Sequence, residues 1–490
     1  MRSSLVYSAA QSYFGVALQL VSTVVLSRIL TPLEVGVFAV ATVFSALASN
    51  FRDFGIAEYL IQARDLSRDN IRAAFAVNIG MSWLMGLVIF FGAGFAADFY
   101  RSALMADVMR VQAFNFLLIP FGAINLAWFR REMNFKPLFL TGMVADVVSL
   151  MVAIGLAMRG HGPMSLAWSS LAGVVVTVIG SMYFRPPDFP RWPGLRGIGE
   201  VLHFGSFASG IYVLGQLGKG APEMIIGRVQ GVADVAIFSR GAGLVQLFRQ
   251  LVLRAISPVC LPYFSKSVRE EGNVNRAYIR GVAIFTGVGW TFLGFLALAS
   301  FPAIRMVYGN QWISSVPLAR ILCVAAAFEL VHQLAKDALL SHGHVKLASR
   351  LQLILQLVQV AGLAAVIPFG LVGACWGMLL SSVLGLGLSQ WHLWLGSQFR
   401  LSDLWAACRR SLAVSAIALA PAAVFFAFFT TTEANYVSHL ILSGALTLLA
   451  WIVAMRATQH LLWIELADLG MVLRKRLSGT PRPPGQTKQP

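Results

Sequence analysis

Two stretches of the chain, which begin 200 residues apart, set its plan. Residues 28–39 read RILTPLEVGVFA, and residues 228–239 read RVQGVADVAIFS. The two stretches align without gaps, and most of the exchanges between them are conservative. The identical pairs are Arg28 and Arg228, Val35 and Val235, and Phe38 and Phe238. Each copy precedes a long apolar segment, so the alignment predicts a chain built from two related halves.

Long apolar segments surround both copies and cover nearly the whole chain. Of the 490 residues, 57% are hydrophobic and only 12% are charged, whereas a soluble domain carries about 25% charged residues. Stretches of about 20 apolar residues can cross the ~30 Å hydrocarbon core of a bilayer. The pattern predicts an all-α integral membrane protein of about 14 transmembrane helices. We place them at residues 8–27, 33–51, 73–98, 108–128, 138–158, 162–184, 202–218, 232–257, 280–301, 317–340, 347–366, 370–395, 404–430 and 436–456.

The positive charges predict which side of the membrane each gap between segments faces. Of the 38 Lys and Arg residues, 27 fall at the N-terminus, at the C-terminus, and in the even-numbered gaps or the segment ends beside these regions. Loops rich in Lys and Arg stay in the cytoplasm during insertion, so we expect both termini to be cytoplasmic. The net charge of +17 is thereby explained by topology and by contact with anionic lipids, and no nucleic-acid partner is expected. The first apolar segment has no small-residue cleavage site after it, so we interpret it as a retained helix.

The sequence gives no sign of a cofactor or of a metal site. The four cysteines form no CxxC pair and lie in or beside apolar segments, where a free cysteine behaves as a small hydrophobic residue. The pair His342 and His344 lacks further ligands. There is no nucleotide-binding fingerprint, which disfavours an ATP-driven pump.

The spacing of the repeat predicts the domain organisation. The two copies are six segments apart, an even number, so both face the same side of the membrane. Such parallel repeats are related by an axis along the membrane normal, and they are typical of transporters with alternating access. We expect an N-terminal six-helix bundle at 1–184, a C-terminal six-helix bundle at 202–395, two additional helices at 404–456, and an amphipathic segment with a disordered cytoplasmic tail at 457–490.

The stretches around both copies resemble a known family. Residues 26–62, LSRILTPLEVGVFAVATVFSALASNFRDFGIAEYLIQ, and residues 225–241, IIGRVQGVADVAIFSRG, are similar to the motifs of oligosaccharide flippases. These flippases form the polysaccharide-transport family within the multidrug/oligosaccharidyl-lipid/polysaccharide exporter superfamily. The second copy departs from many relatives at Ala236 and Ser239, where a Gly and a Tyr-Ser pair are common.

The resemblance implies a function. It implies that the chain is not an enzyme but moves an oligosaccharide linked to undecaprenyl diphosphate across the bacterial inner membrane, for the synthesis of lipopolysaccharide or exopolysaccharide. Coupling to an ion gradient is the expected energy source. A polysaccharide polymerase and glycosyltransferases are the protein partners that the resemblance would imply.

Segment 232–257 is the richest in polar residues and is our candidate for binding the diphosphate. It carries Arg240, Arg249 and Arg254 together with Gln246 and Gln250, and no acid follows Asp234 within it. The planar fork of Arg binds phosphate oxygens in pairs. As an alternative, Arg240 and Arg254 reach the two membrane interfaces with their charged ends.

Three further positions are candidates because ionisable residues inside a span are costly and usually functional. Glu329 and His332 share a face of segment 317–340 and are candidates for a proton-sensitive, ion-coupling pair; a polar patch between helices is the alternative. Asp146 stands alone in segment 138–158, and we expect a cation on another helix as its partner. Arg52, at the cytoplasmic end of segment 33–51, is a candidate contact for the head group, or else part of a solvated loop cluster.

Two other functions remain open. A multidrug antiporter of the same superfamily would need a buried carboxylate for a cationic drug, whereas segment 232–257 is cationic and favours an anionic substrate. A membrane glycosyltransferase or polymerase would need paired carboxylates in sizeable periplasmic loops, and the expected periplasmic gaps are short and hold none.

Overall fold

The computed structural model describes residues 2–53, 55–63, 66–187, 189–190, 192–250, 274–397 and 399–464. Within these ranges the chain is helical throughout and contains no strand, so the prediction of an all-α membrane protein is confirmed. An α-helix satisfies every backbone hydrogen bond within one segment, which the lipid interior requires.

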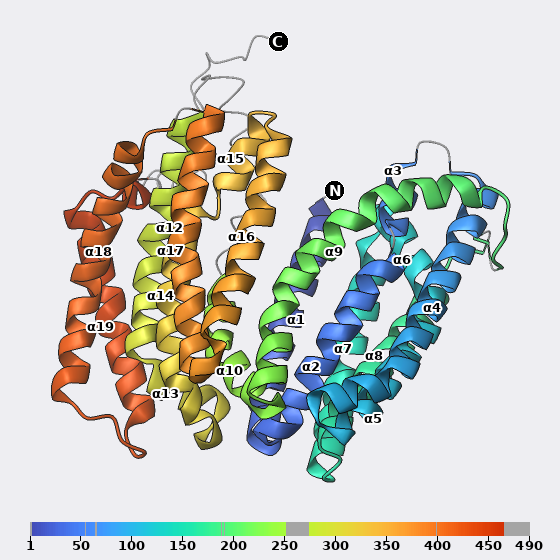
Figure 1. Ribbon diagram of the computed structural model, residues 1–490, viewed down its shortest axis with the longest axis horizontal. Coiled ribbons are helices and arrows are strands. Elements are labelled where there is room, and N and C mark those ends of the chain that lie inside the picture. The colour runs from blue at the N-terminus through green and yellow to red at the C-terminus, as the bar shows by residue number, and fades with distance from the viewer. Residues whose placement is uncertain are drawn as a thin grey trace, which may run out of the picture. The chain divides into compact units, whose positions relative to one another are not determined.

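The first part of the chain forms nine helices within the described ranges (Figure 1). They are α1 (Arg2–Ile29), α2 (Pro32–Asp53), α3 (Ile56–Gln62), α4 (Arg68–Tyr100), α5 (Ala103–Leu118), α6 (Pro120–Arg131), α7 (Phe135–Met158), α8 (Pro163–Tyr183) and α9 (Ile198–Val229).

The remaining helices cover the second half and the C-terminal region. They are α10 (Val232–Phe248), α12 (Val274–Leu298), α13 (Ser300–Tyr308), η2 (Asn310–Ser315), α14 (Val316–His332), α15 (Ala335–Ser341), α16 (Val345–Val366), η3 (Ile367–Phe369), α17 (Gly370–Ser397), α18 (Leu401–Phe428) and α19 (Tyr436–Ala457).

Among the described residues, nine helical stretches are long and apolar enough to cross a membrane, or ten if one bent pair is a single span. One of the nine, Val345–Gly396, is 52 residues long and contains both α16 and α17. The predicted number of about 14 helices is compatible with this arrangement.

Three predicted segments differ in detail from the observed helices. The segment placed at 108–128 is bent by 54° between α5 and α6, where Pro120 has no N–H to continue the helix. The segment placed at 317–340 lies within one helical stretch, Asn310–Ser341, in which a turn separates the end of α14 at His332 from the start of α15 at Ala335. The segment placed at 202–218 extends to Val229, so α9 includes Lys219 and Arg228, which we had placed in a gap.

The chain divides into two compact units. The first unit comprises Met1–Leu244, Ile304–Ala319 and Gln356–Met378. Within it, α7 and α8 run side by side (Figure 1), and glycines on α8 allow their close approach. A Cβ built on Gly180 would lie 2.8 Å from Cγ2 of Thr141 on α7. Small residues at such contacts let helix backbones approach in the membrane, where packing rather than the hydrophobic effect joins helices.

The second unit comprises Val245–Ala303, Arg320–Leu355 and the residues from Leu379 onward. Here α18 packs between α12 and α19 (Figure 1). Buried hydroxyls join α12 to α18, with Oγ1 of Thr286 2.8 Å from Oγ of Ser411, and Oγ1 of Thr291 3.1 Å from Oγ of Ser415. The two helices expected after residue 404 therefore pack on α12 through polar as well as apolar contacts.

Candidate functional site

Both copies of the repeated sequence lie at the start of a helix. In the first copy, Thr31 and Glu34 form a capping box at the start of α2. The backbone N–H of Thr31 donates to Oε2 of Glu34 at 2.8 Å, and the N–H of Glu34 donates to Oγ1 of Thr31 at 3.4 Å. These contacts satisfy backbone donors that the first helical turn leaves free. In the second copy Gly231, with φ 110°, precedes α10.

The two copies touch each other within the first unit. Gly36 of α2 lies against the first residue of α10, where an added Cβ would overlap the backbone carbonyl oxygen of Val232 and lie 2.6 Å from its carbonyl carbon. A side chain of any size is therefore excluded at position 36 unless the helices move apart. The glycine of the first motif thus sets a backbone-to-backbone crossing of α2 and α10.

The two arginines of the repeat make reciprocal contacts. Arg28, at the end of α1, donates from Nη2 to the carbonyl oxygen of Met306 at 2.8 Å. Arg228, at the end of α9, lies with its guanidinium carbon 4.8 Å from the ring centroid of Phe99 on α4. Met306 follows the third apolar segment of the second half, and Phe99 ends the third segment of the first half. Each arginine therefore contacts the equivalent region of the other half of the chain.

Two backbone carbonyls receive matching hydrogen bonds from the same regions. Nε1 of Trp312 donates to the carbonyl oxygen of Ser27 at 2.8 Å, and the Tyr100 hydroxyl donates to the carbonyl oxygen of Met224 at 3.3 Å. We call this set of contacts the motif junction. It consists of Ser27, Arg28, Gly36, Phe99, Tyr100, Met224, Arg228, Val232, Met306 and Trp312, all in the first unit.

Arg240, a predicted diphosphate ligand, is held by aromatic rings beside the motif junction. Its guanidinium carbon lies 5.2 Å from the ring centroid of Tyr308 and 5.0 Å from that of Trp312. Both rings attract a cation through their negative faces. The structure therefore gives Arg240 a packing role here.

Arg249, the second of the three predicted cations along the segment, forms an ion pair with Glu329 of α14. Arg249 lies in a π-helical turn directly after α10. The side chains of Arg249 and Glu329 are 41% and 37% exposed, so the pair is accessible from outside the helix bundle. The acid that is absent from the rest of segment 232–257 comes from a helix 80 residues further along the chain. The pair joins a predicted substrate-binding residue to a predicted ion-coupling residue.

His332 lies one turn after Glu329 at the end of α14. Its side chain is buried, and its Nε2 has no hydrogen-bond partner within the described part of the chain. Gly385 of α17 makes room for the ring, because a Cβ at that position would lie 3.3 Å from Nε2 of His332. The polar group nearest along the helix, Glu329, is engaged by Arg249.

The other predicted substrate-binding residues belong to segment 232–257 or to α2. Gln246 is exposed on α10, and Gln250 is half-buried in the turn that contains Arg249. Arg254 lies outside the described residues. Arg52 donates from Nε to Oδ1 of the adjacent Asp53 at 2.9 Å, and its guanidinium carbon lies 5.8 Å from the ring centroid of Phe116.

Asp146 lines a small polar cavity of about 180 Å³ between α1, α7 and α8. None of the side chains that line it is basic, so the expected partner cation is not found among them. The polar lining residues are Gln19, Ser22, Ser149 and Ser169. These four residues give no joint signal in the sequence because they lie on three different helices, although Gln19 and Ser22 share a helix face with each other.

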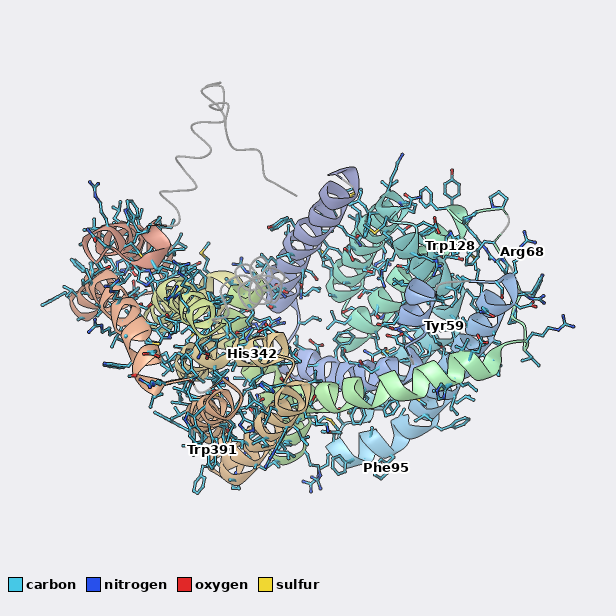
Figure 2. The ribbon with its side chains drawn as sticks, turned by 90° about the horizontal axis from the view of Figure 1, so that it is seen from above. Tyr59, Arg68, Phe95, Trp128, His342 and Trp391 are labelled. Atoms are coloured by element: carbon cyan, nitrogen blue, oxygen red, sulfur yellow. The ribbon has the colours of Figure 1, made fainter. Side chains whose placement is uncertain are left out.

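A larger cavity of about 600 Å³ lies between α2, α4, α5 and α9, and its lining is almost entirely apolar. Five of its lining residues are aromatic, and one of them, Phe95 of α4, lies at the outer edge of the surrounding helices (Figure 2). The side chain of Phe95 is 77% exposed. In a membrane such a side chain contacts lipid. Its lining residues are Phe44, Leu47, Ala48, Phe51, Met85, Val88, Ile89, Gly92, Phe95, Ala96, Phe99, Tyr100, Met109 and Met224.

An all-helical chain with many spans, and with charged pairs and a polar cavity inside them, belongs to the class of multi-pass membrane transport proteins. The model of one family, described as polysaccharide biosynthesis protein, matches residues 25–317. This is more than half of the chain, and the chain belongs to that family.

Curated relatives from several bacteria match most of the chain. The lipopolysaccharide biosynthesis protein WzxC of Escherichia coli is 22% identical over 419 residues, which cover 81% of this chain and 83% of the relative. The teichuronic acid biosynthesis protein TuaB of Bacillus subtilis is 21% identical over 406 residues, covering 81% and 83%. The succinoglycan biosynthesis transport protein ExoT of Rhizobium meliloti is 24% identical over 318 residues, covering 63% and 62%.

Solved structures show the same fold. The lipid II flippase MurJ in an inward closed conformation superposes with a TM-score of 0.74 at 11% identity, over 93% of this chain and 99% of that one. An inward-facing multidrug transporter of the MATE family superposes with a TM-score of 0.57 at 17% identity, over 81% and 95%. ExoT is named as a transport protein, MurJ as a flippase and the MATE protein as a transporter, and none of these three names denotes an enzyme.

Proposed function

We propose that the protein transfers an oligosaccharide linked to undecaprenyl diphosphate from the cytoplasmic to the periplasmic leaflet of the bacterial inner membrane. The observation that carries the proposal is the accessible Arg249–Glu329 pair, in a chain of the polysaccharide biosynthesis family. The names of the relatives, which refer to lipopolysaccharide, teichuronic acid and succinoglycan, support a polysaccharide precursor as the cargo.

Arg249 is the proposed ligand of the cargo diphosphate. The guanidinium of Arg249 already pairs with one carboxylate. A phosphate group of the cargo can pair with the same planar guanidinium and carries more negative charge. The cargo therefore competes with Glu329 for Arg249. Because the two side chains are 41% and 37% exposed, an anion can reach the pair without unfolding a helix.

Glu329 is the proposed coupling group. When Glu329 binds a proton, its negative charge disappears and Arg249 becomes free for the diphosphate. When the proton leaves, the carboxylate regains Arg249 and displaces the cargo. His332, one helical turn away, is placed to exchange that proton.

The motif junction is the proposed periplasmic gate. The distribution of Lys and Arg predicts that the gaps before α2 and α10 face the periplasm and that both termini lie in the cytoplasm. Alternating access between the two halves, 1–184 and 202–395, then requires the Gly36–Val232 crossing to separate. The reciprocal contacts of Arg28 and Arg228 support this pseudo-symmetric arrangement.

The test measures surface polysaccharide in a strain that lacks the chromosomal copy and expresses variants at matched membrane levels. Attraction between unit charges 4 Å apart is worth about 1 kcal/mol in water and about 4 kcal/mol at an effective dielectric near 20. Arg249→Ala is therefore expected to reduce export at least several-fold. Arg249→Lys should keep part of it, because the charge stays and the fork is lost.

A matched control is Arg110→Ala, which breaks an exposed pair with Asp107 at 3.5 Å and should leave export unchanged. Glu329→Gln should bind cargo but release it poorly, so export should fall while lipid-linked cargo copurifies with the variant. Normal export by Arg249→Ala would remove this residue from the mechanism.

A further inference from the structure

Asp146 occupies a position where a lone negative charge is costly. It lies at the middle of α7, which runs from Phe135 to Met158, and so at the centre of a predicted membrane span. A carboxylate at that depth must face a polar space or acquire a positive partner. Asp146 forms no salt bridge with a described residue, so none of the described basic side chains compensates its charge.

The surroundings of Asp146 supply neutral oxygen atoms. Gln19 and Ser22 reach the cavity from α1, Ser149 from α7 and Ser169 from α8. The carboxylate lies against α1, with Oδ2 3.6 Å from the position that a Cβ on Gly15 would take. A bulkier residue at position 15 would narrow the space between α1 and the carboxylate. The cavity thus offers one negative charge and several hydroxyl and amide oxygens from three helices.

This donor set determines the class of ligand. Carboxylate, hydroxyl and amide oxygens suit hard cations, and soft metals prefer sulfur or imidazole. The described residues contain no group of three or more His, Cys, Asp or Glu that could hold a metal ion, and a single carboxylate balances one positive charge. The volume of about 180 Å³ accommodates a small ion with water and is too small for a drug-sized cation.

We propose that the cavity at Asp146 binds Na⁺, with Gln19, Ser22 and Ser149 as neutral ligands beside the carboxylate. The site lies in the first unit, whereas Arg249 and Glu329 belong to the second. The inference rests on the proposed function in one respect: it treats Na⁺ as an ion whose gradient can drive transport. Binding of Na⁺ itself is a property of the isolated protein and requires no cargo.

The experiment uses the full-length protein purified in detergent. Thermal unfolding is followed while NaCl replaces choline chloride at constant ionic strength, with KCl in a parallel series. A ligand that binds only the folded state raises the melting temperature in a saturable way. We expect a rise of about a few degrees with Na⁺, a much smaller one with K⁺, and none for Asp146→Asn with either salt.

Two further variants keep the result interpretable if Asp146→Asn folds poorly. Ser22→Ala and Ser149→Ala retain the carboxylate, and we expect each to raise the half-saturating Na⁺ concentration several-fold. Asp107→Asn alters an exposed carboxylate and should behave as the wild type. Equal effects of Na⁺ and K⁺, or a Na⁺ response that survives in Asp146→Asn, would overturn the proposal.

A proton is the competing ligand, and pH separates the two. Among the described residues that line the cavity, Asp146 alone is titratable, so Na⁺ should bind less tightly at pH 5 than at pH 8. If the site takes only protons, Na⁺ has no effect at either pH, and the Na⁺ assignment is wrong. Either outcome leaves the function proposed for Arg249 untouched, because that function is measured as polysaccharide export.

Discussion

Arg240 of α10 and Arg249, in the turn directly after α10, are compensated in different ways. Arg240 is covered by the rings of Tyr308 and Trp312, whereas Arg249 pairs with the carboxylate of Glu329. An aromatic face attracts a cation without neutralising it, and a carboxylate can be displaced by another anion or neutralised by a proton. This difference is why we propose Arg249 rather than Arg240 as the residue that exchanges its partner for a charged cargo.

His460 is a second residue whose charge matters to the fold. It is buried after the end of α19. Its Nδ1 accepts from the backbone N–H of Leu462 at 3.2 Å, and its Nε2 is 3.0 Å from Oγ of Ser411 on α18. With Nδ1 acting as acceptor, Nε2 carries the proton and donates to Ser411. Protonation of Nδ1 would remove the acceptor for Leu462.

We predict that acid weakens this part of the protein through His460. Burial lowers the pKa of the His460 imidazole below its ordinary value, and the positive charge of Arg410 adds to the effect. A group with a lowered pKa in the folded state stays neutral there, so stability is retained above about pH 6.5 and is lost as the pH falls below it. The melting temperature should therefore fall less between pH 7.5 and pH 5.5 in His460→Gln than in the wild type.

The control for this comparison is His161→Gln, which changes an exposed imidazole and should follow the wild-type curve. Thermal unfolding in detergent at a series of pH values provides the measurement. Parallel curves for the wild type and His460→Gln would show that His460 does not contribute to the pH dependence.

At the scale of helices, the crossing of α2 and α10 depends on Gly36, which has no side chain. Gly36→Ala would place a methyl group 2.6 Å from the carbonyl carbon of Val232. Overpacking of this kind costs about 1–3 kcal/mol. We predict that Gly36→Ala lowers the melting temperature and reduces export, because the closed arrangement of the motif junction can no longer form.

Gly155→Ala on α7 is the matched control, because nothing lies within 4 Å of the added Cβ. Alanine favours a helix over glycine by about 1 kcal/mol, so this variant should be as stable as the wild type or more so. Equal melting temperatures for Gly36→Ala and the wild type would contradict the close crossing.

For the whole molecule, the test concerns which side of the membrane each turn faces. We predict that single cysteines at His161 and Asn310, in a variant without the native cysteines, react with an impermeant reagent added to intact cells from the periplasmic side. A cysteine at Asn134 should react only after the inner membrane is opened. All three positions are exposed and lie in turns or at helix starts. Protection of Asn310 in intact cells would contradict both the topology and the repeat.

A structural feature could be predicted from the sequence where its cause lies in residues that are neighbours along the chain. The membrane spans follow from runs of apolar residues, and the ends of α7, α8 and α19 agree with the prediction to within three residues. The end predicted at residue 218 was wrong for α9, which continues to Val229, because a helix continues wherever its packing and backbone hydrogen bonds allow, whatever the local hydropathy. The bend at Pro120 shows the reverse effect, since one missing N–H interrupts an apolar run.

The sequence by itself determined that this is a helical, multi-pass membrane protein with a repeated motif. These properties depend on composition, on charge distribution and on order along the chain, and all three can be read directly. Only the tertiary structure decided that Arg249 meets Glu329, that Gly36 meets Val232, and that neutral oxygens from three helices surround Asp146. These contacts join residues that are 80 to about 200 positions apart in the chain. Which helix faces meet is decided by helix packing, and no local sequence pattern encodes it.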